Sequence, residues 1–312
     1  MPEYSPASRD DLASVVEFIA SLNVKADHRI GYLGDRPEEI AQDLLEYGAI
    51  DNAFVARRTG ELVGFMAIDV DEGLGRSYLL GPWVDVGNWD EIANRLFDDC
   101  LTIVPDNATE QLEMFFDIAN DNVSRLGKSL GFETYKDVRT LRFDRSDLDA
   151  VRPGTATPVE PRHHESLMRL HDQSFPNTHL PGVRMLEELG ETKACFVRAD
   201  SDDVVGYIYL EVDDTTGSAS LEFVATAERA RGRGIATDLV QTGLRWMFGF
   251  ESVSAAWLVV DEDNVGARRL HERLGWTEVH RLTSMRRAGR PLTTPSSESY
   301  GKERISDKGR FR

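Results

Sequence analysis

The sequence predicts an α/β protein whose α+β mixed sheets belong to two related domains in tandem. Three observations support this prediction. The chain has 312 residues, of which 41% are hydrophobic, enough for two separate cores. Its two halves repeat one another, and each half places helical patterns ahead of a strand-rich stretch. Two copies of one mixed domain are the most economical explanation.

The internal repeat is visible in two pairs of segments. Residues 54–71 match residues 196–213 at an offset of 142, and both segments end in an acidic sequence. Residues 117–132 match residues 261–276 at an offset of 144, and both end in Leu-Gly followed by an aromatic residue. The similar offsets indicate duplication of one domain.

Helical patterns open each half of the chain. They cover residues 10–22 and 37–47 in the first half, and residues 162–172 and 183–189 in the second. Helices ahead of a strand-rich stretch suit a mixed sheet with helices packed on it.

The boundary between the domains is expected around residues 144–161. There Arg152-Pro153-Gly154 and Thr157-Pro158 interrupt any helix or strand. We therefore assign residues 1–148 to a first domain and residues 149–289 to a second.

The second domain contains a segment rich in glycine and arginine between a strand pattern at residues 221–226 and a helix pattern. This loop is Arg229-Ala230-Arg231-Gly232-Arg233-Gly234-Ile235-Ala236. Gly232 and Gly234 let the backbone approach an anion, and the helix that opens at Ile235 adds the positive end of its dipole. Three arginines in the loop, Arg229, Arg231 and Arg233, can then meet phosphate charge. The loop predicts a pyrophosphate site, with an ordinary surface turn as the alternative.

The loop matches neither of two common phosphate motifs. It lacks the Gly-Lys-Ser/Thr of a Walker loop and the spacing of a dinucleotide fingerprint. A second set of signals follows it. An apolar strand pattern at residues 255–260 leads to Asn264, which is suited to cap a helix, and Gly275 closes that helix.

In order and spacing, these segments resemble the GCN5-related N-acetyltransferases (GNAT). The residues that carry the resemblance are Val224-Ala225-Thr226, Arg229-x-x-Gly232-x-Gly234, Asn264 and Leu270-His271-Glu272-Arg273-Leu274-Gly275-Trp276. The resemblance implies acetyl-CoA as co-substrate, with its pyrophosphate on the amides from Arg231 to Ala236. It also implies that the pantetheine arm pairs with the strand at Val224, Ala225 and Thr226, and that Asn264 contacts the cofactor near its reacting end.

Two residues are candidates for the acyl-transfer chemistry. Glu222 alternates with Val224 and Thr226, so we expect the three side chains to share a face and Glu222 to act as general base. A buried ion pair is its alternative role. His271 stands where the family often has the tyrosine that protonates the departing thiolate, and a histidine can donate a proton at neutral pH. An ordinary, partly buried helix position is the alternative for His271.

The first domain lacks this chemistry. At the position of the glycine loop it reads Val86-Gly87-Asn88-Trp89-Asp90-Glu91-Ile92, whose acidic residues would repel a pyrophosphate. The position that matches His271 is Gly127. We expect a degenerate domain kept for packing or for shaping the acceptor site, and a vestigial cofactor site remains open.

Composition limits the partners. The net charge of −18 disfavours nucleic acid as a partner. No stretch is apolar enough to cross a membrane, so we expect a cytoplasmic protein.

Cys100 and Cys195 form no disulfide framework, and the four histidines between residues 163 and 179 lack the spacing of a helical zinc site, so we expect no metal. Residues 290–312 turn polar and gain positive charge, which predicts a disordered tail.

The expected function is transfer of an acetyl group from acetyl-CoA to a primary amine of a small molecule or peptide, in the second domain. The segment from His171 to His179 is expected to be a loop that borders the acceptor pocket. The alternatives are an acyl-CoA sensor or scaffold without catalysis, and a loop for another phosphate ligand. The two domains are expected to pair within the chain or to form a homodimer.

Overall fold

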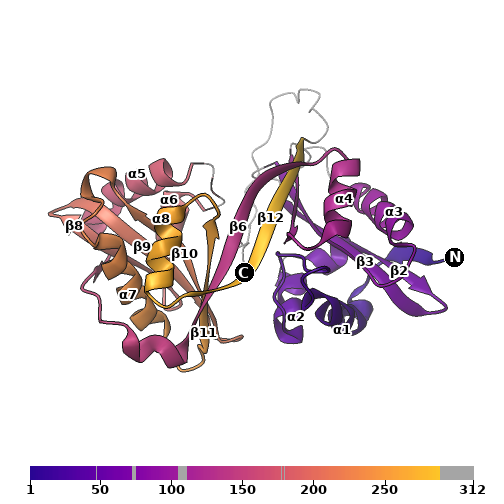
Figure 1. Cartoon of the computed structure of the whole chain (residues 1–312), viewed down its shortest axis with the longest axis horizontal. Coiled ribbons are helices and arrows are strands. Elements are labelled where there is room, and N and C mark those ends of the chain that lie inside the picture. Colours follow the sequence, from indigo (N-terminus) through magenta and orange to yellow (C-terminus); the bar gives the residue numbers. More distant parts are fainter. Residues whose placement is uncertain (47, 72–74, 105–110, 177, 179, 289–312) are drawn as a thin grey trace. The chain divides into compact units, whose positions relative to one another are not determined.

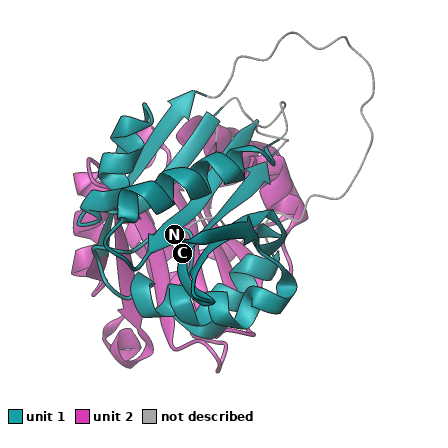
Figure 2. Cartoon of the chain, turned by 90° about the vertical axis from the view of Figure 1, so that its right-hand side faces the viewer, with its two compact units in different colours: residues 1–138, 280–312 teal, residues 139–279 magenta. Residues whose placement is uncertain are grey.

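The computed structural model describes all residues except 47, 72–74, 105–110, 177, 179 and 289–312. The expected tail, residues 290–312, lies outside the described residues. The chain divides into two compact units (Figure 2). Unit 1 combines residues 1–138 with residues from 280 onward, and unit 2 is residues 139–279.

Unit 1 is a mixed sheet with helices on both faces (Figure 1). Its strands follow the order β1-β2-β3-β4-β5-β12, and only β4 and β5 run parallel among the pairs described. The strands are β1 (Glu3–Pro6), β2 (Ala53–Arg58), β3 (Glu61–Asp71), β4 (Arg76–Val84), β5 (Gln111–Asp117) and β12 (Thr277–Ala288). The helices are α1 (Leu12–Asn23), α2 (Pro37–Glu46), α3 (Trp89–Leu101) and α4 (Asp121–Ser129).

Unit 2 repeats this arrangement. Its strand order is β6-β11-β10-β9-β8-β7, with β10 and β11 parallel. The strands are β6 (Glu133–Asp144), β7 (Thr157–Pro158), β8 (Lys193–Asp200), β9 (Asp203–Asp213), β10 (Ser218–Thr226) and β11 (Ala255–Asp261). The helices are α5 (His164–Ser174), α6 (Gly182–Glu187), α7 (Ile235–Met247) and α8 (Val265–Arg273). The mixed-sheet α/β fold and the tandem repeat are therefore confirmed.

Several corresponding elements of the two units have equal lengths. Helices α3 and α7 both have 13 residues, α4 and α8 both have 9, and β6 and β12 both have 12. The cap of the last helix is repeated as well. Asn120 accepts a hydrogen bond from the Val123 amide, as Asn264 does from Ala267, each at 3.1 Å. The duplication thus preserves local hydrogen bonds as well as strand order.

The last strand of each unit comes from the other half of the sequence. Strand β12 pairs with β5 from Leu282↔Asp117 to Ala288↔Gln111, whereas β6 neighbours β11. The units consequently differ from the sequence domains 1–148 and 149–289, because β6 and β12 each cross a unit boundary. The sequence domains describe the duplicated stretches and stay a prediction.

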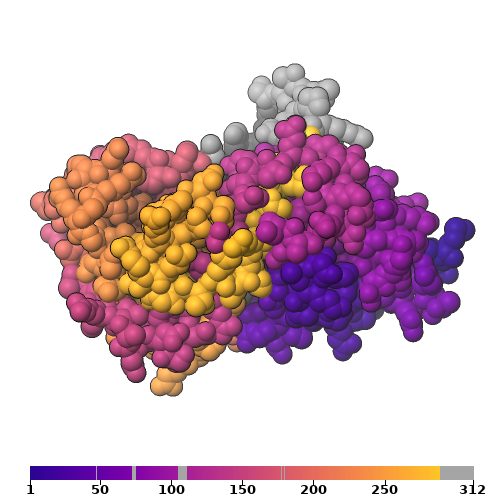
Figure 3. Space-filling view, in the orientation of Figure 1, coloured from indigo at the N-terminus to yellow at the C-terminus, as the bar shows by residue number. Residues whose placement is uncertain are grey.

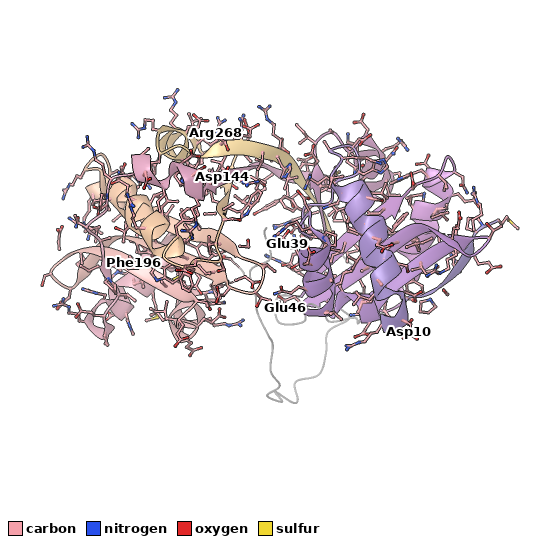
Figure 4. All side chains as sticks on the ribbon, turned by 90° about the horizontal axis from the view of Figure 1, so that it is seen from below. Asp10, Glu39, Glu46, Asp144, Phe196 and Arg268 are labelled. Atoms are coloured by element: carbon pink, nitrogen blue, oxygen red, sulfur yellow. The ribbon has the colours of Figure 1, made fainter. Side chains whose placement is uncertain are left out.

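The exchanged strand β6 is firmly held in unit 2. Leu141 and Phe143 are buried in the core that α7 covers. Arg139 donates a hydrogen bond to Glu262 at 2.7 Å, and Arg268 lies 3.6 Å from the same carboxylate. Asp144 at the end of β6 and Arg268 on α8 are labelled in Figure 4.

Two core clusters hold the helices of unit 2 against opposite faces of the sheet. The cluster under α7 takes in Leu239, Val240, Leu244 and Met247. The cluster under α5 and α6 is built around Tyr207, Tyr209 and Phe223. Strand β10 therefore lies between two packed layers.

The predicted break at Thr157-Pro158 was wrong in one respect. These two residues form the short strand β7, which pairs with β8 at Val197 and Phe196. Proline is tolerated there because β7 is an edge strand. Its place in the fold corresponds to β1 of unit 1, so in each unit a short edge strand precedes the first helix that packs on the sheet.

Candidate active site

Strands β10 and β11 pair only at their beginning. The parallel ladder joins Ser218, Ala219 and Ser220 to residues 255–257 and then stops, although β10 continues to Thr226 and β11 to Asp261. The edge of β10 that faces β11 therefore has no strand partner beyond Ser220 among the described residues. Unpaired backbone groups along such an edge are suited to hydrogen-bond an extended ligand.

The predicted strand residues lie on this open edge. Val224, Ala225 and Thr226 are half-buried. The Oγ1 atom of Thr226 is buried and has no hydrogen-bond partner in the described part of the chain. A buried hydroxyl without a partner is unfavourable, so this atom is suited to meet a ligand group.

A β-bulge interrupts β10 at Glu222. Leu221 pairs with Leu210 and Phe223 pairs with Tyr209, so Glu222 is an extra residue on its strand. A bulge breaks the two-residue alternation, so the alternation argument does not hold here and the face shared by Glu222, Val224 and Thr226 stays a prediction. As a result of the bulge, Leu221 packs on the face of the sheet that α7 covers, whereas Phe223 packs on the face that α5 and α6 cover.

Glu222 lies in an acidic environment near Tyr209. Burial, with the carboxylates of Glu211, Glu188 and Glu222, raises the pKa of the Tyr209 hydroxyl. Lys193 balances part of this charge, since its Nζ lies 2.6 Å from Glu188 and 3.0 Å from Glu211. The surface beside the bulge is thus rich in carboxylates, on the α5 and α6 side of the sheet.

The glycine loop joins the end of β10 to α7. Gly232 has φ +79° and Gly234, the N-cap of α7, has φ +78°, a conformation that favours glycine. A Cβ atom at either position would meet nothing within 4 Å, so the space beside the loop is open. No hydrogen bond within the described residues occupies the amides from Gly232 to Thr237. These donors and the α7 dipole make an anion site.

The three loop arginines have different surroundings. Arg229 forms an ion pair with Asp203. The Arg233 guanidinium donates a hydrogen bond to the Arg229 carbonyl at 3.1 Å. Arg231 is exposed and has no ion-pair partner among the described residues. Of the three, Arg231 thus has the guanidinium most available to a bound anion.

Asn264 is the N-cap of α8 and His271 lies within this helix, which covers part of the face seen in Figure 3. Asn264 is exposed and caps the helix through its side-chain oxygen. His271 is 2% exposed and packs edge-on against Trp276, with ring centroids 5.7 Å apart. Burial lowers the pKa of His271 to about 4, so the ring is neutral at pH 7.

The expected loop from His171 to His179 is partly helix, because α5 continues to Ser174. His171 is fully buried. Its Nε2 lies 2.8 Å from the Leu180 carbonyl, to which it donates, and its Nδ1 therefore accepts from the Tyr207 hydroxyl at 2.5 Å. His171 is a core residue, an outcome for which the sequence held no clear signal. His179 lies outside the described residues.

Unit 1 keeps the open strand edge without the glycine loop. Strands β4 and β5 pair only from Arg76 to Leu79 on β4. Four residues join β4 to α3, against eight between β10 and α7. The lining of a cavity of about 410 Å³ at this place includes Asp85, Asp90 and Glu91, and Asp90 forms an ion pair with Arg125 at 2.8 Å. A Cβ atom on Gly127 would lie 3.2 Å from Met285 Sδ, so this position has little room for a side chain.

Metal and membrane features were searched in the described part of the chain. It holds no group of three or more His, Cys, Asp or Glu side chains placed to bind a metal ion. None of its helices combines the length and the apolar character needed to span a membrane. Cys100 and Cys195 are buried free thiols, and burial raises the pKa of both.

Comparison with known proteins identifies a family match and a curated relative for this sequence. Residues 164–276 match the acetyltransferase (GNAT) family profile. The chain is 26% identical over 176 residues to the mycothiol acetyltransferase of Streptomyces griseus, a match that covers 52% of this chain and only 57% of that protein.

Solved structures share the whole fold. A GCN5-related N-acetyltransferase from Sphaerobacter thermophilus superposes with a TM-score of 0.69 at 20% identity, covering 93% of this chain and 96% of that one. A tandem GNAT protein from the clavulanic acid biosynthesis pathway gives 0.63 at 13% identity, covering 94% and 100%. The family match lies in unit 2, so residues 164–276 belong to the acetyltransferase (GNAT) family, and the duplicated fold of the chain is similar to that of tandem GNAT proteins.

Proposed function

We propose that unit 2 transfers an acetyl group from acetyl-CoA to a primary amine of a small molecule or peptide. The observation that carries this proposal is the meeting of the open β10 edge with the glycine loop at the start of α7. The edge suits an extended arm with amide groups, and the loop suits a diphosphate at one end of that arm.

Each part of the site would hold a different part of acetyl-CoA. The amides of Gly232, Arg233, Gly234, Ile235 and Ala236 would bind the diphosphate. The expected contribution of the Arg231 amide does not hold, because that amide donates to the Glu228 carbonyl at 3.2 Å, but the exposed Arg231 guanidinium would add charge. The edge at Val224, Ala225 and Thr226 would pair with the pantetheine arm, and the Thr226 hydroxyl would gain a partner. Asn264 would use its side-chain NH2, because its oxygen caps α8. This arrangement aims the thioester toward the bulge at Glu222.

The proposed reaction is direct transfer. A neutral amine attacks the thioester carbonyl, the carbon–sulfur bond breaks, and the amine loses one proton as the thiolate gains one. Glu222 accepts the amine proton, directly or through water, and the released thiolate takes its proton from solvent. His271 is neutral, so it would stabilise the thiolate by donating a hydrogen bond from its ring N–H and would not act as a cationic acid.

The surroundings of the bulge favour a cationic acceptor. Glu188 and Glu211 lie beside Tyr209 on the same side of the sheet, and Lys193 neutralises only part of their charge. An ammonium group would be attracted to this surface before it loses its proton. The likeness to a mycothiol acetyltransferase makes that enzyme's acceptor one candidate among primary amines.

One observation favours a second candidate, an acyl-CoA sensor without catalysis. His271 takes the place of a proton-donating tyrosine. Its burial against Trp276 lowers its pKa to about 4, so the ring is neutral at pH 7 and is a poor proton donor. A sensor would bind acetyl-CoA and transfer nothing to any amine.

Calorimetric titration of acetyl-CoA tests the proposal. We expect one equivalent to bind the wild-type chain and binding to be lost in Gly234→Glu, which puts a carboxylate into the anion site. Gly87→Glu is the matched control, since a Cβ on Gly87 also meets nothing within 4 Å but lies in the loop of unit 1. Release of free thiol in the presence of primary amines then separates the transferase from the sensor. A wild-type chain that binds no acetyl-CoA would refute both.

A further inference from the structure

Two of the three loop arginines hold the loop itself. Arg233 donates to the Arg229 carbonyl, and Arg229 is paired with Asp203 at the start of β9. The loop is also tied to β9 through the Ala227 amide, which donates to the Val205 carbonyl at 2.9 Å. The base of the loop is therefore fastened to β9 by both backbone and side chain.

Asp203 is fixed on its other side by α5. Its Oδ1 accepts a hydrogen bond from the Ser166 hydroxyl at 2.9 Å and lies 3.5 Å from the Arg169 guanidinium. Ser166 is 8% exposed, and its oxygen accepts from the Val204 amide at 2.9 Å. The carboxylate of Asp203 thus joins α5 to the loop and is held before any ligand arrives.

We infer that Asp203 is a positioning residue for acetyl-CoA binding, which it serves by clamping Arg229 to the base of the glycine loop. In this arrangement Arg229 does not contact the diphosphate. It keeps the residues before Gly232 in place, so that the free amides face the ligand together. The inference rests on the proposed function, and it replaces the expected contact between Arg229 and phosphate.

The alternative is that Arg229 leaves Asp203 to bind phosphate. Asp203 would then compete with the ligand, and its removal would strengthen binding. The clamp predicts the reverse, because an exposed ion pair that preorganises a loop contributes to affinity only while both partners are present. The two readings differ in the sign of one measured effect.

The test is a double-mutant cycle in the full chain, with the Kd of acetyl-CoA measured by calorimetry. We expect Asp203→Asn, Arg229→Gln and the double variant to raise Kd by the same factor, about three- to tenfold. At saturating acetyl-CoA, kcat should be unchanged. Tighter binding in Asp203→Asn, or no effect of Arg229→Gln, would overturn the clamp.

Asp202→Asn is the matched control, since its carboxylate removes the same charge but lies near Arg162 at 3.9 Å. Hydrogen exchange of the loop amides in the protein without ligand gives a second readout. We expect faster exchange in Asp203→Asn and wild-type rates in Asp202→Asn, and equal rates in both would refute the clamp. If the wild-type chain binds no acetyl-CoA, the proposed function fails while the exchange measurement still decides the clamp.

Discussion

At the scale of single residues, the bulge gives Glu222 its special position. A bulge turns an extra carboxylate out of the regular ladder, beside the place where the strand edge opens. We predict that Glu222→Gln lowers kcat by about 10²-fold or more while the Kd of acetyl-CoA stays unchanged, because the variant loses a base and no cofactor contact. Steady-state rates and calorimetry measure the two quantities. Glu272→Gln on the exposed side of α8 is the control, and equal effects of both variants would argue against a base.

The buried ring of His271 makes a prediction about stability and pH. Its pKa falls from 6.5 to about 4 on folding, so below pH 6.5 the unfolded chain gains a proton that the folded protein resists. Stability is therefore unaffected above pH 6.5 and is lost as the pH falls toward 4, by roughly 3 kcal/mol in total. His271→Phe should remove this part of the acid sensitivity. Urea unfolding at pH 7 and pH 4.5 checks it, and parallel losses in both proteins would contradict it.

At the scale of elements, the equivalent capping residues of α4 and α8 allow the contribution of a helix cap to stability to be measured separately from a contact with acetyl-CoA. Asn120 and Asn264 make the same cap, so replacing either with alanine should destabilise the protein by about 1 kcal/mol. Asn120 should cost more, because it is 2% exposed and also donates to the Arg29 carbonyl. Only Asn264→Ala should raise the Kd of acetyl-CoA. Asn264→Asp keeps the cap and loses the NH2 donor, so wild-type affinity in this variant would exclude a contact from that group.

The elements also show which features of the fold and the site could be predicted from the sequence. The helix of residues 235–247, the cap at Asn264 and the glycine loop follow from local patterns, because spacing and backbone preference act over a few residues. The bulge at Glu222 and the burial of His171 and His271 depend on neighbouring strands and helices. No periodicity in one segment encodes those contacts, so the alternation argument failed at the bulge.

At the scale of the whole molecule, the strand exchange separates the duplicated sequence from the compact unit. Duplication fixed which residues repeat, but the pairing of β12 with β5 decided which strand completes which sheet. A break made at residue 148 leaves β6 on the wrong fragment. Unit 2 would then lose Leu141 and Phe143 from its core, which are 2% and 1% exposed.

We therefore predict that a fragment of residues 139–279 unfolds cooperatively and that a fragment of residues 149–289 is less stable by several kcal/mol. The reason is the loss of two large core side chains and of the Arg139 contact to Glu262. Urea unfolding followed by circular dichroism compares the two. Because β12 is the repeat of β6, it has the length to take the vacant place beside β11. Equal stability of the fragments would mean that it does so, and that either strand can complete unit 2.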